Sequence, residues 1–153
     1  MLRMSKLTDY GTMVLAQLAT TEGTIASASQ VADATHIAAP TVSKLLKSLA
    51  RAGLVVSERG PLGGYALARA AEQITAAEII DALEGPVAIT ACSSTDVRCD
   101  LQRFCRVGHA WQHINRNIRA ALQQITLADL QTGAIPPAPA MLGRPRKPVA
   151  AAH

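Results

Sequence analysis

Apolar residues recur every three or four positions along the first fifty residues, which is the spacing of one face of an α-helix. The pattern predicts a first helix over residues 5–20, a second over 29–35, and a third that starts near Pro40 and ends before Gly53. Proline is favoured in the first turn of a helix, and glycine is favoured just beyond the last turn. Short segments of polar or small residues separate the three predicted helices.

Two short β-prone runs follow, at residues 54–57 and 65–67, and the loop between them is rich in glycine and proline. A further helix is expected from Thr75, because Thr75 and Glu78 have the spacing of a capping box. The Gly-Pro pair at 85–86 should end it. Three helices, a two-stranded hairpin and another helix, in this order, predict a mainly helical winged helix-turn-helix fold.

A second helical pattern lies further along the chain, where apolar residues are spaced alternately by four and three positions. This heptad spacing is typical of a long helix that packs along another helix, either in its own domain or in a second copy of the chain. We expect the second arrangement, a homodimer, because a long helix after a complete small domain more often pairs with a copy of itself. The predicted interface consists of Val107, Trp111, Ile114, Ile118 and Ile125.

These patterns divide the chain into four segments. They are a winged helix-turn-helix domain at 1–86, a cysteine-containing loop at 87–106, a dimerisation helix with a short final helix at 107–132, and a Pro/Ala-rich tail at 133–153. The final helix should begin at Thr126, which has an aspartate three residues later. The composition of the tail is typical of disordered segments.

Composition and charge narrow the class of protein. Hydrophobic residues make up 49% of the chain and aromatic residues 3%, so the core must consist of aliphatic side chains. Residues 1–70 carry seven Lys/Arg and four Asp/Glu, and this basic balance suits a polyanion. Because apolar runs are far shorter than the roughly 20 residues that span a bilayer, and a secretory signal is not apparent, we expect a cytoplasmic protein without a membrane partner. An enzyme is not expected.

The exposed face of the third predicted helix carries residue types that contact double-stranded DNA. In a helix-turn-helix the second helix lies in the major groove, and here hydroxyl and basic side chains alternate with leucines. The glycine-rich hairpin loop would let an arginine approach a minor groove. A solvated helix face and an ordinary turn are the alternative, but the ordered combination favours DNA binding. The predicted contacts are Thr41, Ser43, Lys44, Lys47, Arg51, Arg59, Gly60 and Gly63.

Three cysteines, Cys92, Cys99 and Cys105, lie close together in a polar stretch of sequence. An odd number of cysteines in one short segment favours metal or thiol chemistry over a disulfide framework. Thiolates are soft ligands that suit an iron–sulfur cluster or zinc. Closed zinc sites usually have tighter spacing, and the loop is too polar for a core. We therefore expect an iron–sulfur cluster, either 2Fe–2S or 4Fe–4S, with zinc as the alternative.

Four segments together resemble the family of iron–sulfur winged-helix transcription regulators that contains IscR and NsrR. They are the opening at 5–11, the hairpin at 59–65, the three-cysteine loop, and residues 125–130. The resemblance covers about residues 1–130, and the opening is most similar to the branch that regulates the SUF iron–sulfur assembly system. It implies a homodimer on palindromic DNA, a long helix at the dimer contact, and a cluster held by the three cysteines.

The resemblance leaves the fourth cluster ligand open. In one branch of the family a histidine serves, but Gly108 occupies the matching position, one residue before His109. In another branch an aspartate from the first helix of the partner chain serves, and Asp9 lies in the matching segment. Asp9 is therefore the first candidate and His109 the second. Asp9 would also fit a purely structural role in the first turn of its helix.

The sequence thus predicts a transcription regulator, expected to repress iron–sulfur assembly genes and to sense cluster status or oxidative and nitrosative stress. A bound cluster would change the spacing of the two recognition helices. One alternative is a carrier or scaffold that passes clusters to other proteins, which would need no basic recognition helix. Another is a cofactor-free thiol switch in which Cys99 and Cys105 form a disulfide.

Overall fold

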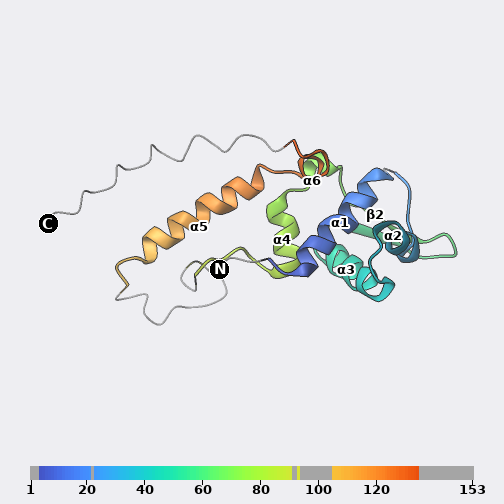
Figure 1. Cartoon of the computed structure of the whole chain (residues 1–153), viewed down its shortest axis with the longest axis horizontal. Coiled ribbons are helices and arrows are strands. Elements are labelled where there is room, and N and C mark those ends of the chain that lie inside the picture. The colour runs from blue at the N-terminus through green and yellow to red at the C-terminus, as the bar shows by residue number, and fades with distance from the viewer. Residues whose placement is uncertain (1–3, 22, 91–92, 94–104, 135–153) are drawn as a thin grey trace.

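The computed structural model describes residues 4–21, 23–90, 93 and 105–134 of the 153-residue chain. The fold is mainly helical with a two-stranded wing, as predicted, and a long helix follows the winged domain (Figure 1). Within the described residues, no helix has the length and apolar character needed to cross a membrane. In chain order the elements are α1 (Lys6–Thr20), α2 (Ala28–Thr35), α3 (Ala39–Arg51), β1 (Val55–Glu58), β2 (Gly64–Leu67), the 3-10 helix η1 (Ala71–Gln73), α4 (Ala76–Glu84), α5 (Gly108–Gln123) and α6 (Leu127–Thr132).

Helix starts follow the predicted capping chemistry. The Thr75 hydroxyl accepts the backbone N–H of Glu78, and the Glu78 carboxylate accepts the backbone N–H of Thr75, so the predicted capping box of α4 is confirmed. Thr126 and Asp129 form the same reciprocal pair at the start of α6. A further capping box at the start of α2 was not predicted. Each box satisfies backbone donors that the first turn of a helix leaves without an intrahelical acceptor.

The hydrophobic core lies where α1, α2, α3 and α4 meet beneath the wing. Its side chains are aliphatic, as the low aromatic content requires, and full burial of each contributes about 1.5–3 kcal/mol. One core residue comes from α6, which returns to the winged domain after α5. The largest fully buried side chains are Leu15, Leu46, Leu49, Leu54, Ile74, Ile79 and Leu127.

The wing is an antiparallel pair in which Val55 lies opposite Leu67. Its second strand also pairs with the segment before α2, because the backbone N–H groups of Ala26 and Tyr65 each donate to the other residue's carbonyl at 2.9 and 2.8 Å. Gly64 fits this crossing because a Cβ there would overlap the Ala26 carbonyl. The hairpin is therefore anchored beside the helix-turn-helix.

Helix α5 extends away from the winged domain and returns to it through α6 (Figure 1). The backbone N–H of Ala76 donates to the Ile125 carbonyl, and that of Leu127 donates to the Ile74 carbonyl, both at 2.8 Å. These bonds fix the C-terminal end of α5 beside the start of α4. The predicted helical seam ran to Ile125, but α5 ends at Gln123, so Ile125 lies in the link between α5 and α6.

Candidate functional site

The turn between α2 and α3 sets the position of the third helix. His36 ends α2 with a left-handed backbone (φ 56°), and Ile37 is buried in the core immediately afterwards. Pro40 lies in the first turn of α3, where its missing N–H costs no helical bond. The start of α3 is consequently exposed at Ala39 and Pro40, which is where a recognition helix enters a groove.

Helix α3 separates its apolar and polar residues onto opposite faces. Lys44, Lys47 and Arg51 are exposed, while Thr41 and Ser43 are partly exposed. The sequence therefore located the exposed face of α3, although its contact with DNA stays a prediction. The buried face, which holds the helix on the core, consists of Val42, Leu45, Leu46 and Leu49.

The loop of the wing begins at Arg59, directly after β1, and Arg59 and Gly60 are exposed. The backbone N–H of Gly63 donates to the Gly60 carbonyl at 3.0 Å and closes the turn. A Cβ at Gly63 would overlap the Glu58 carbonyl, so this tight turn requires glycine there. Leu62 stands at the tip with 93% of its surface exposed.

Between α3 and the wing lies a hollow of about 470 Å³. Two of its lining residues, Lys47 and Arg51, are predicted DNA contacts. The Arg51 guanidinium donates to the Lys47 carbonyl and the Ser48 hydroxyl, both at 3.3 Å, and so lies against the last turn of α3. The basic end of α3 thus faces the wing across a concave surface. The hollow is lined by Lys47, Ala50, Arg51, Ser57 and Tyr65.

Of the three predicted cluster ligands, Cys105 is described, and Cys92 and Cys99 lie outside the described residues. Cys105 is a partly buried free thiol just before α5, and a Cβ at Gly108 would lie 3.6 Å from its Sγ. Asp9 is exposed on α1 and His109 is exposed in the first turn of α5. In the described part of the chain, no three His, Cys, Asp or Glu side chains come together as a metal site would require.

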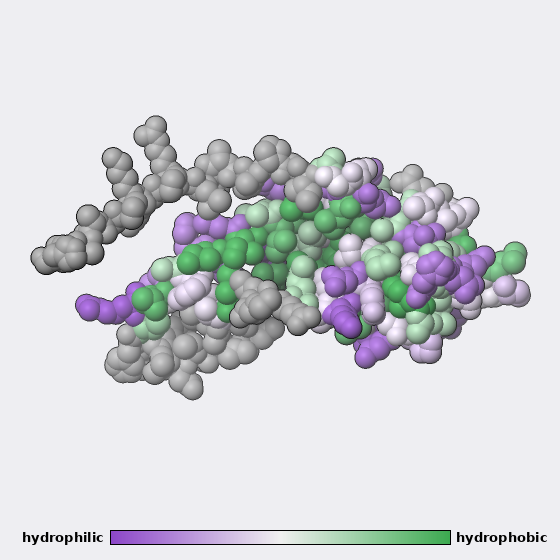
Figure 2. Space-filling view, in the orientation of Figure 1, coloured by the Kyte–Doolittle hydropathy of each residue, from purple (hydrophilic) through white to green (hydrophobic). Residues whose placement is uncertain are grey.

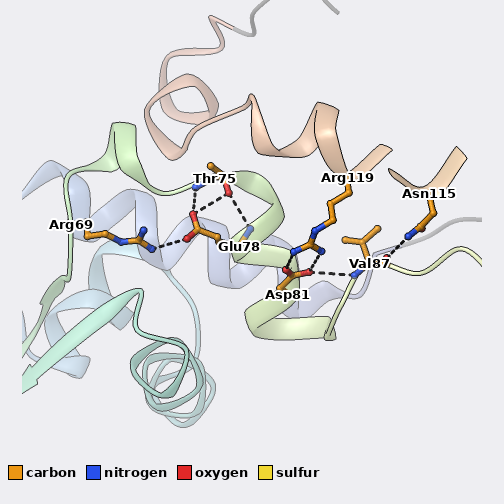
Figure 3. Close-up of polar contacts among 7 residues, drawn as sticks. All are labelled: Arg69, Thr75, Glu78, Asp81, Val87, Asn115 and Arg119. Carbon is orange, nitrogen blue, oxygen red and sulfur yellow. Dashed lines mark hydrogen bonds and ion pairs between the residues drawn. The ribbon is translucent and has the colours of Figure 1, made fainter. Parts of the chain in front are cut away.

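A polar network that the sequence did not predict holds residues 87–89 against α5 (Figure 3). The Asn115 amide nitrogen donates to the Val87 carbonyl at 3.0 Å, and its oxygen accepts the Ile89 N–H at 3.2 Å. Asp81 of α4 accepts the Val87 N–H at 3.3 Å and pairs with Arg119 of α5. The hydrogen bonds to Asp81 raise the pKa of Arg119. The sequence offered one sign of this network: Asn115 is a polar residue directly after Ile114, a position of the predicted apolar seam.

A second unpredicted contact joins the end of α4 to the start of α1. The Glu84 carboxylate accepts hydrogen bonds from the Ser5 hydroxyl, the Thr8 hydroxyl and the Ser5 backbone N–H, the last at 3.0 Å. The Ser5 hydroxyl bond, together with the other two, lowers the pKa of Glu84. Ser5 also caps α1, so the structure assigns the cap to Ser5 and leaves Asp9 as an exposed first-turn carboxylate.

Apolar side chains of α5 remain exposed: Val107 before its first turn is 58% exposed, Trp111 is 39% and Ile114 is 41%. Figure 2 shows a hydrophobic band that runs along α5 onto the middle of the molecule. There α1, α4 and α6 border a largely apolar groove. Its lining residues are Met4, Thr8, Asp9, Thr12, Met13, Ala16, Ala76, Ile79, Ile80, Leu122, Ile125, Leu130 and Gln131.

The chain matches the Rrf2 family, described as iron-dependent transcriptional regulators, over residues 4–133. Among solved structures it is similar to CymR (YrzC), the global cysteine regulator of B. subtilis, at 32% identity and a TM-score of 0.65, covering 87% of this chain and 98% of that one. It is similar to T. potens IscR at 30% identity and a TM-score of 0.63, covering 87% and 88%. The oxidized form of Staphylococcus aureus CymR matches at 29% identity and a TM-score of 0.60, covering 85% and 96%.

Proposed function

Because the chain belongs to the Rrf2 family of transcriptional regulators, we propose that it represses iron–sulfur assembly genes as a homodimer and senses iron–sulfur status through a bound cluster. Family membership makes it a DNA-binding transcription regulator and not an enzyme. The observation that carries the DNA-reading part of the proposal is the exposed basic face of α3 beside an arginine-bearing wing.

DNA contact is tested by salt dependence. Lys47→Ala and Arg59→Ala should each weaken binding to all duplexes and lower the slope of log affinity against log salt by about one unit, because each removes one phosphate contact. Thr41→Ala or Ser43→Ala should instead change which sequences are preferred, since hydroxyl groups read base edges. Lys6→Ala, an exposed lysine on α1, is the control. Unchanged slopes for Lys47→Ala and Arg59→Ala would place the DNA surface elsewhere.

The homodimer is supported by two apolar surfaces that a single chain leaves uncovered. The exposed stripe of α5 and the groove between α1, α4 and α6 have matching chemistry. In a two-fold dimer the stripe of each copy would enter the groove of the other, so both surfaces would be buried twice. A two-fold dimer presents its two α3 helices to a palindromic operator.

The cluster proposal rests on the chemistry of the donor set. Three thiolates and a fourth oxygen or nitrogen ligand suit an iron–sulfur cluster, and the family description names iron. Cys105 precedes α5, and Asp9 lines the groove into which we place the partner's α5. That arrangement supports Asp9 of one chain as the fourth ligand to the other chain's cysteines, with His109 as the alternative. When bound, the cluster would link these side chains through a redox-active centre.

Anaerobic purification tests the cofactor. The protein should be coloured and contain iron and acid-labile sulfide, and replacement of Cys92, Cys99 or Cys105 by alanine should bleach it. Asp9→Ala should alter the spectrum and the difference in DNA affinity between the cluster-loaded and cluster-free forms, whereas His109→Ala should not. The reverse result would reassign the fourth ligand. Stoichiometric zinc without sulfide, in protein kept anaerobic, would contradict the cluster.

A cofactor-free thiol switch is the second candidate, and one observation favours it: a similar regulator, S. aureus CymR, has been crystallised in an oxidized form. In this chain Cys99 and Cys105 would form a disulfide, and the two protons and two electrons that their thiols lose would reduce an oxidant such as hydrogen peroxide to two waters. A colourless, iron-free protein whose DNA affinity responds to peroxide, and loses that response in Cys105→Ser, would establish this candidate instead.

A further inference from the structure

Among the described residues, hydrogen bonds join helix α5 and its C-terminal link to the winged domain at two places of different character. At its C-terminal end, backbone hydrogen bonds of Ile125 and Leu127 to the start of α4 fix the chain rigidly, and Leu127 is buried in the core. The helix itself extends from Gln123 back to Gly108 and is about 24 Å long, at 1.5 Å per residue. When such a helix changes its angle about its C-terminal end, its N-terminal end is displaced the most.

The second attachment, about 6–12 Å from the C-terminal end of α5, is polar. Among the residues of α5, all of which the structure describes, Asn115 is the one that is buried, with 8% of its surface exposed. Its amide group bonds both backbone partners in the segment after α4, while Arg119, one turn further on, pairs with Asp81 (Figure 3). Asp81 in turn accepts the Val87 N–H. We call these two contacts, Asn115 with residues 87–89 and Arg119 with Asp81, the strut; it joins α5 to α4 and to the segment that follows α4.

The strut has strict geometry because its central hydrogen bonds are directional. The Asn115 amide donates with one end and accepts with the other, so it fits residues 87–89 in one register. An apolar contact between α4 and α5 would tolerate sliding, whereas a displaced buried amide would leave polar groups unpaired at a cost of about 1–3 kcal/mol each. Trp111 and Ile114 of α5 are exposed, so these two apolar side chains do not restrain this angle in a single chain.

We propose that Asn115 is the positioning residue that sets the angle between α5 and the winged domain, and thereby the distance between the two α3 helices of the dimer. The inference rests on the proposed dimeric DNA-binding function. Cys105 lies beside Gly108 at the N-terminal end of the same helix, where a small change of angle produces the largest displacement. Asn115 therefore lies between the cysteine and the fixed end of the helix.

The test uses the full chain and a palindromic duplex selected by the wild-type protein from a random pool, together with the same duplex carrying one or two base pairs inserted at its centre. Asn115→Ala should remain dimeric by light scattering and keep the wild-type salt slope. Its preference for the selected spacing over the one-base-pair insertion should fall at least tenfold. Asn117→Ala is the matched control, since the Asn117 amide contacts only His113 of its own helix among the contacts observed in the described residues.

Hydrogen exchange provides a readout that does not depend on DNA. The Ile89 N–H should exchange at least tenfold faster in Asn115→Ala and at the wild-type rate in Asn117→Ala. In Asn115→Asp the carboxylate still accepts the Ile89 N–H but does not donate to the Val87 carbonyl, so that variant should keep Ile89 protection yet lose the spacing preference. Asn115→Asp decides the matter if Asn115→Ala does not fold.

Wild-type spacing preference in both folded Asn115 variants would overturn the proposal, as would unchanged Ile89 exchange in Asn115→Ala. A wild-type protein that is monomeric, or that selects no palindrome, would instead reject the proposed function on which the inference rests. The oligomeric state and the duplex selection of the wild-type protein therefore distinguish a failure of the proposed function from a failure of this inference.

Discussion

The winged domain and helix α5 share the same kind of sequence pattern, but the apolar residues in that pattern have different surroundings in the two regions. Both carry apolar residues at helical spacing, but in the winged domain these side chains are covered by other elements of the same chain. Leu15, Leu46 and Leu49 are fully buried, whereas Trp111 and Ile114 of α5 are exposed. The buried position on α5 belongs to an asparagine. The apolar faces of the winged domain are thus covered within one chain, whereas Trp111 and Ile114 of α5 are left exposed.

This difference shows that periodicity identifies the apolar face of a helix without identifying what covers it. The apolar faces of the first three helices are covered by one another, by α4 and by Leu127 of α6, all in the same chain, so the pattern and the fold coincide. On α5 the buried residue is Asn115, Leu122 is partly buried, and Trp111 and Ile114 are exposed, so the periodic pattern does not mark the contact with the same chain. The following predictions separate the two cases, from the largest expected effect to the smallest.

The largest effect is expected on association. Trp111→Asp combined with Ile118→Asp should convert the proposed dimer to a monomer and abolish binding to a palindromic duplex, because the proposed interface would bury charges without partners. The winged domain of the monomer should still unfold cooperatively in urea. His113→Asp, at an exposed position on the same helix, is the control. A double variant that stays dimeric in light scattering would show that the stripe is not the interface.

A core truncation should act on stability instead. Leu46→Ala should lower the free energy of unfolding by about 2–5 kcal/mol, because it removes buried surface and leaves a cavity in the winged domain. The same change at Leu62, at the exposed tip of the wing, should alter it by less than about 0.5 kcal/mol. Urea denaturation at fixed protein concentration measures both. Equal effects at the two leucines would mean that the winged domain does not fold around this core.

A smaller effect is expected at the junction of the two regions. Thr126→Ala removes the cap of α6, which follows the fixed end of α5, and should cost about 0.5–2 kcal/mol in urea denaturation. Ser29→Ala, at an exposed position of α2, should be nearly neutral. Hydrogen exchange should show the loss first at the Leu127 N–H, which bonds the Ile74 carbonyl. Protection of that amide in Thr126→Ala equal to the wild type would exclude a role of the cap in fixing α5.

The smallest expected effect is on how the free energy of unfolding changes at acidic pH. Hydrogen bonds from the Ser5 hydroxyl, the Thr8 hydroxyl and the Ser5 N–H lower the pKa of Glu84, so its folded pKa lies below its unfolded value. Stability from this contact is therefore present above the unfolded pKa, near 4.5, and is lost as the pH falls through the folded pKa. Glu84→Gln should slightly flatten the decline of stability below about pH 5 in urea titrations. Glu72→Gln, at an exposed position, is the control, and identical curves would show that the contact does not form in solution.

Much of the winged domain could be predicted because its determinants are local. The capping pair Thr75–Glu78, the proline of α3 and the glycines of the wing act within a few residues, and so does the pair Thr126–Asp129 at the start of α6. The bonds of Asn115 and Glu84 could not be predicted, since each joins segments far apart in the chain. The heptad pattern overran α5 because Ile125 is apolar in the right register, while its carbonyl is committed to Ala76.

The burial of Leu127 has a consequence for how the protein is made. A ribosome releases the chain from its N-terminus, so the first four helices and the wing emerge before the residue that completes their core. Until then the nascent domain lacks a fully buried leucine and should be weaker by about 2–5 kcal/mol, the usual cost of such a cavity. The winged domain therefore reaches full stability only after α5 and the start of α6 have been synthesised. A chain that ends before Leu127 should contain a less stable winged domain.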